Sequence, residues 1–363
     1  MIDPIKGDAT RVLAEFVYRG ASIQNVVLEN GVNGWVYALN QLERVAGSDI
    51  WHLTVAVPAD VRLGYVFREN DDLIPWYAEP QQGKRWSANR PDPLNPRVDS
   101  AQNRRSQLIG PRAEPDTLSF ARSGVPAGRV EEITIDSRAV EATRSVAVYL
   151  PPRVPTTGLP ILLVFDGPTY RHTVRLPLIL DNLIAANRIT PVVAIFVSQL
   201  NRMQELAPNE GFTRYICDEL LPTVRARFGV TADPRRTIVM GSSHGGLAAD
   251  WMGLSHPELF GNVISQSASL WWSPDGDPEP EFLARHVVRE PRTATRFWIE
   301  VGRFEVDQSQ GGGPGQVEVS RHFRDVLRAK GNEVSYSEFP GGHEYQSWRV
   351  TTPRALMHFL APR

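Results

Sequence analysis

The sequence has almost no cysteine, almost no net charge and no long apolar run. Cys217 is the only cysteine among the 363 residues, so a disulfide within the chain is excluded. The formal net charge is −2 and no long basic run occurs, which argues against a nucleic-acid-binding protein. No apolar stretch reaches the length of a membrane-spanning helix, and the N-terminus lacks the basic-then-apolar pattern of a secretory signal.

These absences set the first expectations. We expect a cytoplasmic protein with no membrane and no nucleic-acid partner, present as a monomer or a weak homo-oligomer. Cys217 lies in a segment with a helical pattern, where a buried structural thiol is expected. The length of the chain favours two domains.

The first part of the chain, residues 1–115, has the pattern of a small β-sandwich. Short runs with rough alternation of apolar and polar residues lie at 33–39, 51–57 and 61–68, spaced as in an antiparallel sandwich. From about residue 98 the chain becomes rich in Arg, Ser and Pro, a composition typical of a linker that packs on the surface. We place the linker proper at 116–127.

Residues 128–363 have a different pattern, in which predicted strands alternate with helical segments. The predicted strands are 144–150, 160–166, 191–198, 236–240, 263–265, 296–301 and 333–339. Those at 161–165 and 192–197 are apolar throughout, as strands buried on both faces of a parallel sheet are. This part is therefore predicted to be of the α/β class with a doubly wound sheet. A helix is predicted at 317–330, and the glycine-rich stretch 311–315 is interpreted as a surface loop.

A candidate nucleophile follows the predicted strand at 236–240. Gly241, Ser243 and Gly245 form a Gly-x-Ser-x-Gly pattern, and small, helix-compatible residues come after it. A sharp turn from strand to helix holds such a serine hydroxyl above the carboxyl end of a sheet, as in α/β-hydrolases. Glycine is needed on both sides because the turn is too tight for side chains. We predict that Ser243 is a nucleophile.

A serine needs a general base, and the best candidate among the eight histidines is His343. It follows the last predicted strand and two glycines, at the place where an α/β-hydrolase carries its base. The orienting acid is expected after the preceding strand, where Glu305 is the first choice and Asp307 the second. If both acids lie far from His343, a Ser-His dyad is expected instead.

The oxyanion is expected to bind to two backbone amides. His244 follows the nucleophile directly, so its N–H is well placed to donate, although its side chain points poorly for a base. The second donor is expected in the loop after an early strand. Gly167 is the candidate there, since Pro168 has no N–H.

With these residues in place, the chain resembles the enterochelin (enterobactin) esterase family over nearly its whole length. Five separated segments carry the resemblance: 92–96, 201–206, 241–246, 265–272 and 341–349. Two residues depart from the family pattern. Glu344 stands where aspartate is usual, and Ala268 stands where glycine is usual. Neither replaces the nucleophile or the base.

The resemblance implies a cytoplasmic enzyme that hydrolyses the seryl ester bonds of a tri-catecholate lactone, ferric or iron-free, and so releases iron. It would need no cofactor or metal of its own, because iron enters with the substrate. A ferric catecholate is aromatic and anionic, so Trp271 and Trp272 could stack on its rings and Arg202 and Arg349 could pair with its oxygens. Arg85 and Trp86 are weaker candidates for a lid from the sandwich.

Each of these interpretations has an alternative. The tryptophans could pack at a domain interface, Arg202 could pair with Glu205 at helical spacing, and Arg349 could be a solvated cation. The chain could also be a serine esterase or acyltransferase acting on another aryl or carbohydrate ester. A second alternative is a non-catalytic protein that binds ferric catecholates.

Overall fold

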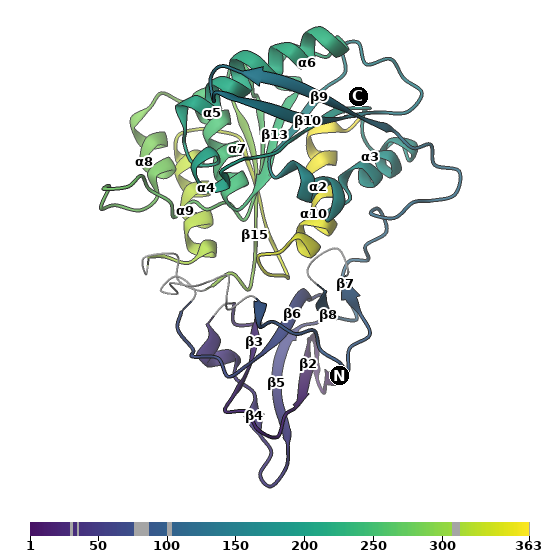
Figure 1. Ribbon diagram of the computed structural model, residues 1–363, viewed down its shortest axis with the longest axis vertical. Helices are drawn as coiled ribbons and strands as arrows, with labels where there is room; N and C mark the ends of the chain where they lie inside the picture. Colours follow the sequence, from purple (N-terminus) through teal and green to yellow (C-terminus); the bar gives the residue numbers. More distant parts are fainter. Residues whose placement is uncertain (30–31, 35, 76–86, 100–103, 307–312, 363) are drawn as a thin grey trace. The chain divides into compact units, whose positions relative to one another are not determined.

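The structure, a computed structural model, describes residues 1–29, 32–34, 36–75, 87–99, 104–306 and 313–362 (Figure 1). The chain forms two compact units, and each is described by itself. Unit 1 comprises residues 1–115, 301–318 and 338–347, and unit 2 comprises 116–300, 319–337 and 348–363. Two short segments from late in the chain therefore belong with the N-terminal residues.

The N-terminal residues of unit 1 form two four-stranded sheets around one core. The first has the order β1 (Ile2–Ile5), β2 (Asp8–Arg19), β5 (Ile50–Pro58), β4 (Glu43–Arg44). The second has the order β3 (Val26–Glu29), β6 (Arg62–Glu69), β8 (Arg105–Ile109), β7 (Val98–Asp99). Apolar residues of both sheets share a core, in which the rings of Phe16 and Tyr65 meet edge to face at 4.9 Å. The predicted sandwich is present.

Two local predictions for this unit were wrong. Residues Tyr37–Asn40 form a 3₁₀ helix instead of the end of a strand at 33–39, because the buried Asn40 amide donates to the Gly34 carbonyl and closes a turn. The stretch from residue 98 is not all linker, since β7 and β8 lie within it. The sequence pattern does not predict β8, because this strand buries the polar residue Ser106, whose hydroxyl accepts the N–H of Asp92.

The α/β part is built on an eight-stranded sheet of order β16-β15-β14-β13-β11-β12-β10-β9. Its strands are β9 (Arg129–Ser137), β10 (Ala142–Leu150), β11 (Ile161–Val164), β12 (Val193–Val197), β13 (Thr237–Ser242), β14 (Asn262–Gln266), β15 (Arg296–Gly302) and β16 (Val334–Phe339). Strands β12, β11, β13, β14 and β15 pair in parallel, while β10 and β9 are antiparallel. All seven predicted strands are present.

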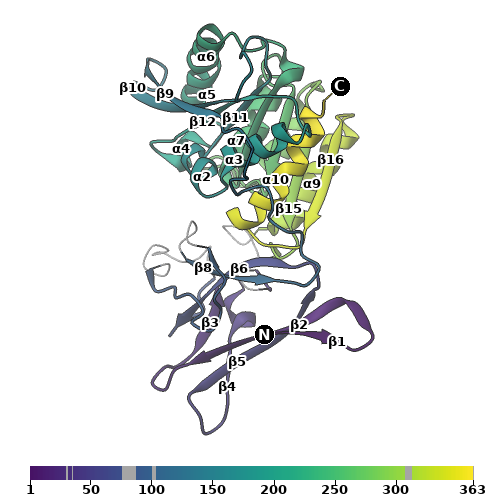
Figure 2. The same ribbon diagram turned by 90° about the vertical axis from the view of Figure 1, so that its right-hand side faces the viewer.

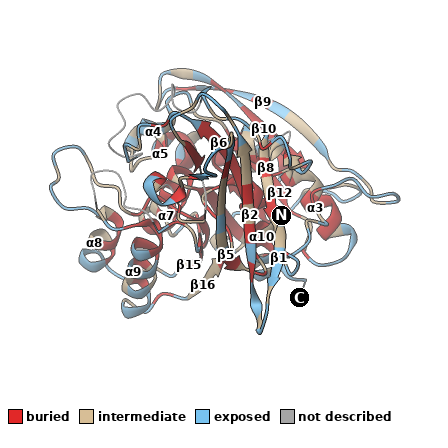
Figure 3. Cartoon of the chain, turned by 90° about the horizontal axis from the view of Figure 1, so that it is seen from below, coloured by how far each residue is buried: buried red, intermediate tan, exposed pale blue. Residues whose placement is uncertain are grey.

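Helices cover both faces of this sheet. Helices α2 (Gly167–His172), α3 (Leu176–Ala185) and α10 (Tyr345–Leu360) lie on one face, and α7 (His244–Ser255), α8 (Phe282–Arg289) and α9 (Gln316–Ala329) on the other (Figures 1 and 2). Further helices are α4 (Arg202–Glu205), α5 (Glu210–Arg214) and α6 (Leu221–Phe228). Helices α8 and α9 bury one side and expose the other (Figure 3). The predicted α/β fold is confirmed.

Cys217 lies in a π-helical turn, Tyr215–Leu220, between α5 and α6. The thiol is buried, as expected, and burial raises its pKa to about 12. Within the described part of the chain, no helix combines the length and the apolar character needed to cross a membrane.

Candidate active site

Ser243 occupies a strained turn between β13 and α7. Its backbone has φ 56° and ψ −125°, a conformation that a residue with a side chain adopts only where the surroundings enforce it. A Cβ on Gly241 would lie 2.1 Å from the carbonyl oxygen of Gly245, so glycine is required there. The turn is fixed by hydrogen bonds from Ser243 N to Gln266 O and from Ser269 N to Ser243 O, both of 3.0 Å. This is the geometry of a nucleophile elbow.

The side chain of His244 is buried against Ser269 and Trp271. It is 4% exposed, its Nδ1 lies 3.0 Å from Ser269 Oγ, and its ring meets Trp271 edge to face at 5.8 Å. Ser269 Oγ in turn lies 3.5 Å from Ser243 Oγ. Ser269 thus links the nucleophile to His244, a role that the sequence did not reveal although Ser269 lies in one of the five quoted segments.

The predicted oxyanion loop is held by an ion pair. Asp166 adopts a left-handed conformation with φ 52° and precedes Gly167, the first residue of α2. Arg202 donates from Nε and Nη2 to the two carboxylate oxygens of Asp166 at 2.8 and 2.7 Å. A Cβ on Gly167 would come within 2.4 Å of the Phe196 backbone, so the loop passes too close to β12 for any other residue.

A buried polar network lies next to the elbow, around Gln266. Gln266, at the end of β14, accepts the Tyr170 hydroxyl at 2.6 Å and donates to Glu300 at 2.6 Å. Thr351 of α10 also donates to Glu300, whose carboxyl has a pKa raised by burial. Tyr170 belongs to α2, so the network joins the helix of the oxyanion loop to β14, where the Gln266 carbonyl accepts the N–H of Ser243. Sequence reasoning missed it because its members are far apart in the chain.

His343 and Glu305 lie together in unit 1. His343 Nδ1 is 2.6 Å from Glu305 Oε2, while Glu305 Oε1 accepts the N–H of Gly302 at 2.7 Å. Glu305 is 3% exposed, so it is not a solvated loop carboxylate. The two loops are joined by a hydrogen bond from Phe304 N to Gly341 O at 3.1 Å. Asp307, the second candidate acid, lies outside the described residues.

The four predicted substrate residues differ in their surroundings. Trp271 and Trp272 are half-buried, and Trp272 packs edge to face on Phe282 at 5.7 Å. Arg202 pairs with Asp166 and not with Glu205, yet its side chain stays 38% exposed. Arg349 is 6% exposed and its Nε donates to the Thr173 carbonyl at 3.0 Å.

Arg349 is therefore not the solvated cation of the alternative interpretation, and its burial also limits contact with a substrate. Its place within α10, a helix packed on the sheet, could not be foreseen from a loop-like sequence context. Arg85 and Trp86, the candidates for a lid, lie outside the described residues.

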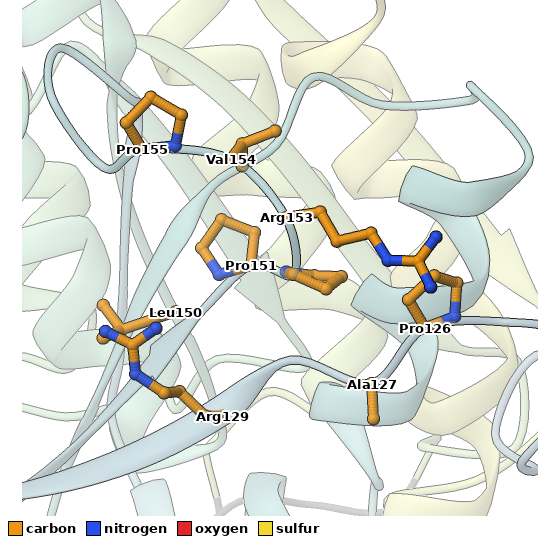
Figure 4. Close-up of a pocket in the computed structure, with 9 residues that line it drawn as sticks. Pro126, Ala127, Arg129, Leu150, Pro151, Arg153, Val154 and Pro155 are labelled. Carbon is orange, nitrogen blue, oxygen red and sulfur yellow. The ribbon is translucent and has the colours of Figure 1, made fainter.

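A hollow of about 620 Å³ lies beside β9 and β10, at one edge of the sheet (Figure 4). It is lined by the start of β9, the end of β10 and a proline-rich loop: Pro126, Ala127, Arg129, Leu150, Pro151, Pro152, Arg153, Val154 and Pro155. Because β10 runs antiparallel to β12, the end of β10 is at the amino ends of the parallel strands, whereas Ser243 follows a carboxyl end. This hollow is separate from the elbow. Among the described residues, no group of three or more His, Cys, Asp or Glu side chains could hold a metal ion.

The fold and the elbow define an enzyme class. A doubly wound sheet with a strained serine between a central strand and the following helix is typical of α/β-hydrolases, which use that serine as a nucleophile. A histidine after the last strand, paired with a buried carboxylate, is the arrangement that serine hydrolases of this class use for proton transfer.

Comparison with known proteins identifies the family. Residues 137–359 match a family model described as putative esterase, and residues 13–117 match the N-terminal domain of enterochelin esterase. The chain belongs to this esterase family, in the group that carries the enterochelin esterase N-terminal domain, and it is a carboxylic ester hydrolase. The family predicted from the sequence is confirmed.

Similar proteins match over most of the chain. The iron(III) enterobactin esterase of Dickeya dadantii is 29% identical, covering 85% of this chain and 76% of that protein. The iron(III) salmochelin esterase of Escherichia coli O6:H1 is 26% identical, covering 96% and 88%. The crystal structure of the enterobactin esterase of Shigella flexneri, determined in the presence of enterobactin, matches with a TM-score of 0.77 and 22% identity, covering 99% of this chain and 95% of that one.

Proposed function

We propose that this protein hydrolyses the seryl ester bonds of a catecholate siderophore such as enterobactin, in its ferric or iron-free form, and so releases iron inside the cell. The observation that carries the chemistry is the strained elbow at Ser243. The substrate class rests on the similar proteins, which are named for enterobactin and salmochelin and match along both parts of the chain.

In the proposed mechanism, Ser243 attacks the ester carbonyl while His343 accepts its proton. The chain order Ser243, Glu305, His343 is the order in which α/β-hydrolases carry their triad. Because Nδ1 of His343 faces Glu305, the serine proton would pass to Nε2. The Glu305 carboxylate holds the ring in that tautomer and stabilises the imidazolium that forms.

The tetrahedral oxyanion would be held by the backbone N–H groups of His244 and Gly167. His244 begins α7, and the N-terminus of a helix favours a negative charge. Asp166 and Arg202 would keep the Gly167 loop in place during the reaction. His343 then protonates the departing seryl hydroxyl and activates a water molecule, which releases the acyl group from Ser243.

The siderophore would be recognised by its aromatic and anionic character. Trp271 supports this role because its half-buried ring lies against His244, the residue next to the nucleophile. The exposed fraction of Arg202 leaves room for a contact with catecholate oxygens beside its pair with Asp166. Arg349 has the weaker claim because it is buried.

Metal requirement and location are further parts of this proposal. We infer that the protein uses no metal of its own and that any iron is part of the substrate, so hydrolysis of the iron-free siderophore should survive chelation. Cys217 is a free thiol, which suits a reducing compartment such as the cytoplasm. Cell fractionation tests the location.

Mass spectrometry of the products tests the proposed function. Iron-loaded and iron-free catecholate siderophores are incubated with the wild type, Ser243→Ala and His343→Ala. The proposal predicts that the wild type adds one water per cleaved ester and that both variants lose turnover.

Other results would favour the alternatives. Turnover of aryl or carbohydrate esters alone would indicate another esterase. Acyl products that require an added alcohol would indicate a transferase. Tight binding of ferric catecholates without any product would indicate a binding protein.

A further inference from the structure

The loops that carry the acid and the base pack with the N-terminal β-sandwich. Both loops lie in segments, 301–318 and 338–347, that belong to unit 1 with residues 1–115. The Arg62 N–H, at the start of β6, donates to the Pro340 carbonyl at 2.9 Å, three residues before His343. Phe304, next to Glu305, packs against the apolar core of the sandwich. The sandwich therefore contacts both loops.

One side chain of the base loop reaches into the sandwich. Glu344, the residue after His343, is 1% exposed, and its Oε1 accepts the N–H of Gly64 in β6 at 2.6 Å. Ser347 Oγ lies 3.4 Å from the same oxygen. A Cβ on Gly64 would come within 2.3 Å of Glu344 Oε2, so the carboxylate fits only against a glycine.

The surroundings of Glu344 make this a costly place for a carboxylate. Burial raises its pKa to about 7, while Arg105 of β8, the Gly64 N–H and Ser347 act in the opposite direction. Arg105 is shared, since it pairs with the buried Glu29 of β3 at 2.8 Å, and Glu29 raises the pKa of Glu344 further. A group buried at such cost and bonded so specifically fixes the position of its own backbone.

We propose that Glu344 is a positioning residue that anchors the base loop to strand β6 and so sets the place of His343. The sandwich then contributes to the chemical step through Gly64 and Glu344, in addition to any contact with substrate. This inference rests on the proposed role of His343 as general base. A base displaced by about 1 Å can cost about 100-fold in rate, so loss of the anchor lowers kcat.

Three substitutions in the full-length chain test the anchor. Glu344→Ala removes the carboxylate, and Gly64→Ala pushes it away without changing it, since Gly64 lies in a strand and has no positive φ. Glu344→Gln keeps an oxygen that can accept the Gly64 N–H. We expect kcat to fall about 10- to 100-fold in the first two with KM within about twofold, and Glu344→Gln to stay close to the wild type.

Asp71→Ala is the matched control. Asp71 is a buried carboxylate of the sandwich that pairs with Arg68 at 2.7 Å and accepts the N–H of Leu73 at 2.7 Å, so its loss destabilises the same unit. We expect Asp71→Ala to lower the melting temperature. At temperatures below its own melting temperature, the variant should keep the wild-type kcat. The rate at which a phosphonate labels Ser243 should fall with kcat in Glu344→Ala and Gly64→Ala.

The outcomes separate this inference from the proposed function. If His343→Ala keeps full activity, the proposed function fails. If His343→Ala is inactive but Glu344→Ala and Gly64→Ala keep the wild-type kcat, only the anchor is refuted. Equal loss of kcat in Asp71→Ala would also refute it, because general destabilisation would then explain the effect. Should Glu344→Ala fail to fold, Gly64→Ala decides.

Discussion

Glu305 and His343 are joined by a contact of 2.6 Å between Oε2 and Nδ1, and the other carboxylate oxygen is bound to a backbone N–H. With both oxygens engaged and the side chain 3% exposed, Glu305 has little freedom to move. The pair is thus arranged to fix the tautomer and the orientation of the imidazole.

Replacing this acid should slow catalysis strongly. In Glu305→Gln the amide can favour the wrong tautomer of His343, so we expect kcat to fall about 10²- to 10⁴-fold with little change in KM. Glu281→Gln is a control, because Glu281 makes a similar 2.5 Å contact with His322, whose side chain is 57% exposed. Steady-state kinetics on an aryl ester checks this. A loss below tenfold would indicate a Ser-His dyad.

Substitution of Arg202 should distinguish support of the oxyanion loop from binding of substrate. The bidentate pair with Asp166 needs the planar guanidinium group of Arg202. Both Arg202→Lys and Arg202→Ala should therefore weaken the pair. If the pair mainly holds the loop, we expect kcat to fall about tenfold or more in both variants. Kinetics on a small neutral ester and on a catecholate siderophore separates the roles, since loss confined to the KM of the siderophore would contradict loop support.

The network around Gln266 should be important for stability. Gln266→Leu removes the acceptor of the Tyr170 hydroxyl and one of the donors to the buried Glu300 carboxyl, so we expect the free energy of unfolding to fall by about 2 kcal/mol or more. Denaturant unfolding measures this, with Gln204→Leu on exposed α4 as the control. A loss within about 1 kcal/mol would show that the network is dispensable for stability.

Asp250 on the nucleophile helix should make stability depend on pH. Burial raises its pKa from 3.8 to about 8, against a 2.6 Å hydrogen bond from Ser265. The folded state therefore keeps a proton that the unfolded state loses, so this contribution to stability is complete below pH 3.8 and is lost as pH rises toward about 8.

Asp250→Asn should remove that dependence. We expect the stability of the variant relative to the wild type to increase between about pH 4 and 8 and then to level off. Thermal unfolding across this range is the measurement. Asp325→Asn serves as the control, since the pKa of this exposed residue is lowered by Arg324 and it does not titrate in that window. A constant difference between Asp250→Asn and the wild type would refute the prediction.

The sequence predicted the parts of the site that depend on local patterns. An apolar strand followed by Gly-x-Ser-x-Gly predicts the elbow at Ser243, since the tight turn itself requires glycine at position 241. His343 could be predicted for a similar reason, because it follows a strand and two glycines. The α/β fold could be predicted because strands buried on both faces are apolar throughout.

The sequence could not predict the parts that depend on buried polar contacts between distant residues. Gln266, Glu300 and Ser269 are polar residues with partners in other elements, and no local pattern marks them. Arg202 illustrates the same limit, since helical spacing favours Glu205 but the fold supplies Asp166. Glu344 is bonded to a residue 280 positions away.

The most direct test of the account follows Ser243 and the siderophore together. Ferric enterobactin is incubated with the wild type and with Ser243→Ala, and both the products and the intact protein are weighed by mass spectrometry. We expect linear products carrying one added water per cleaved ester from the wild type, and unchanged enterobactin bound to a folded Ser243→Ala variant. Hydrolysis by Ser243→Ala at the wild-type rate would contradict it.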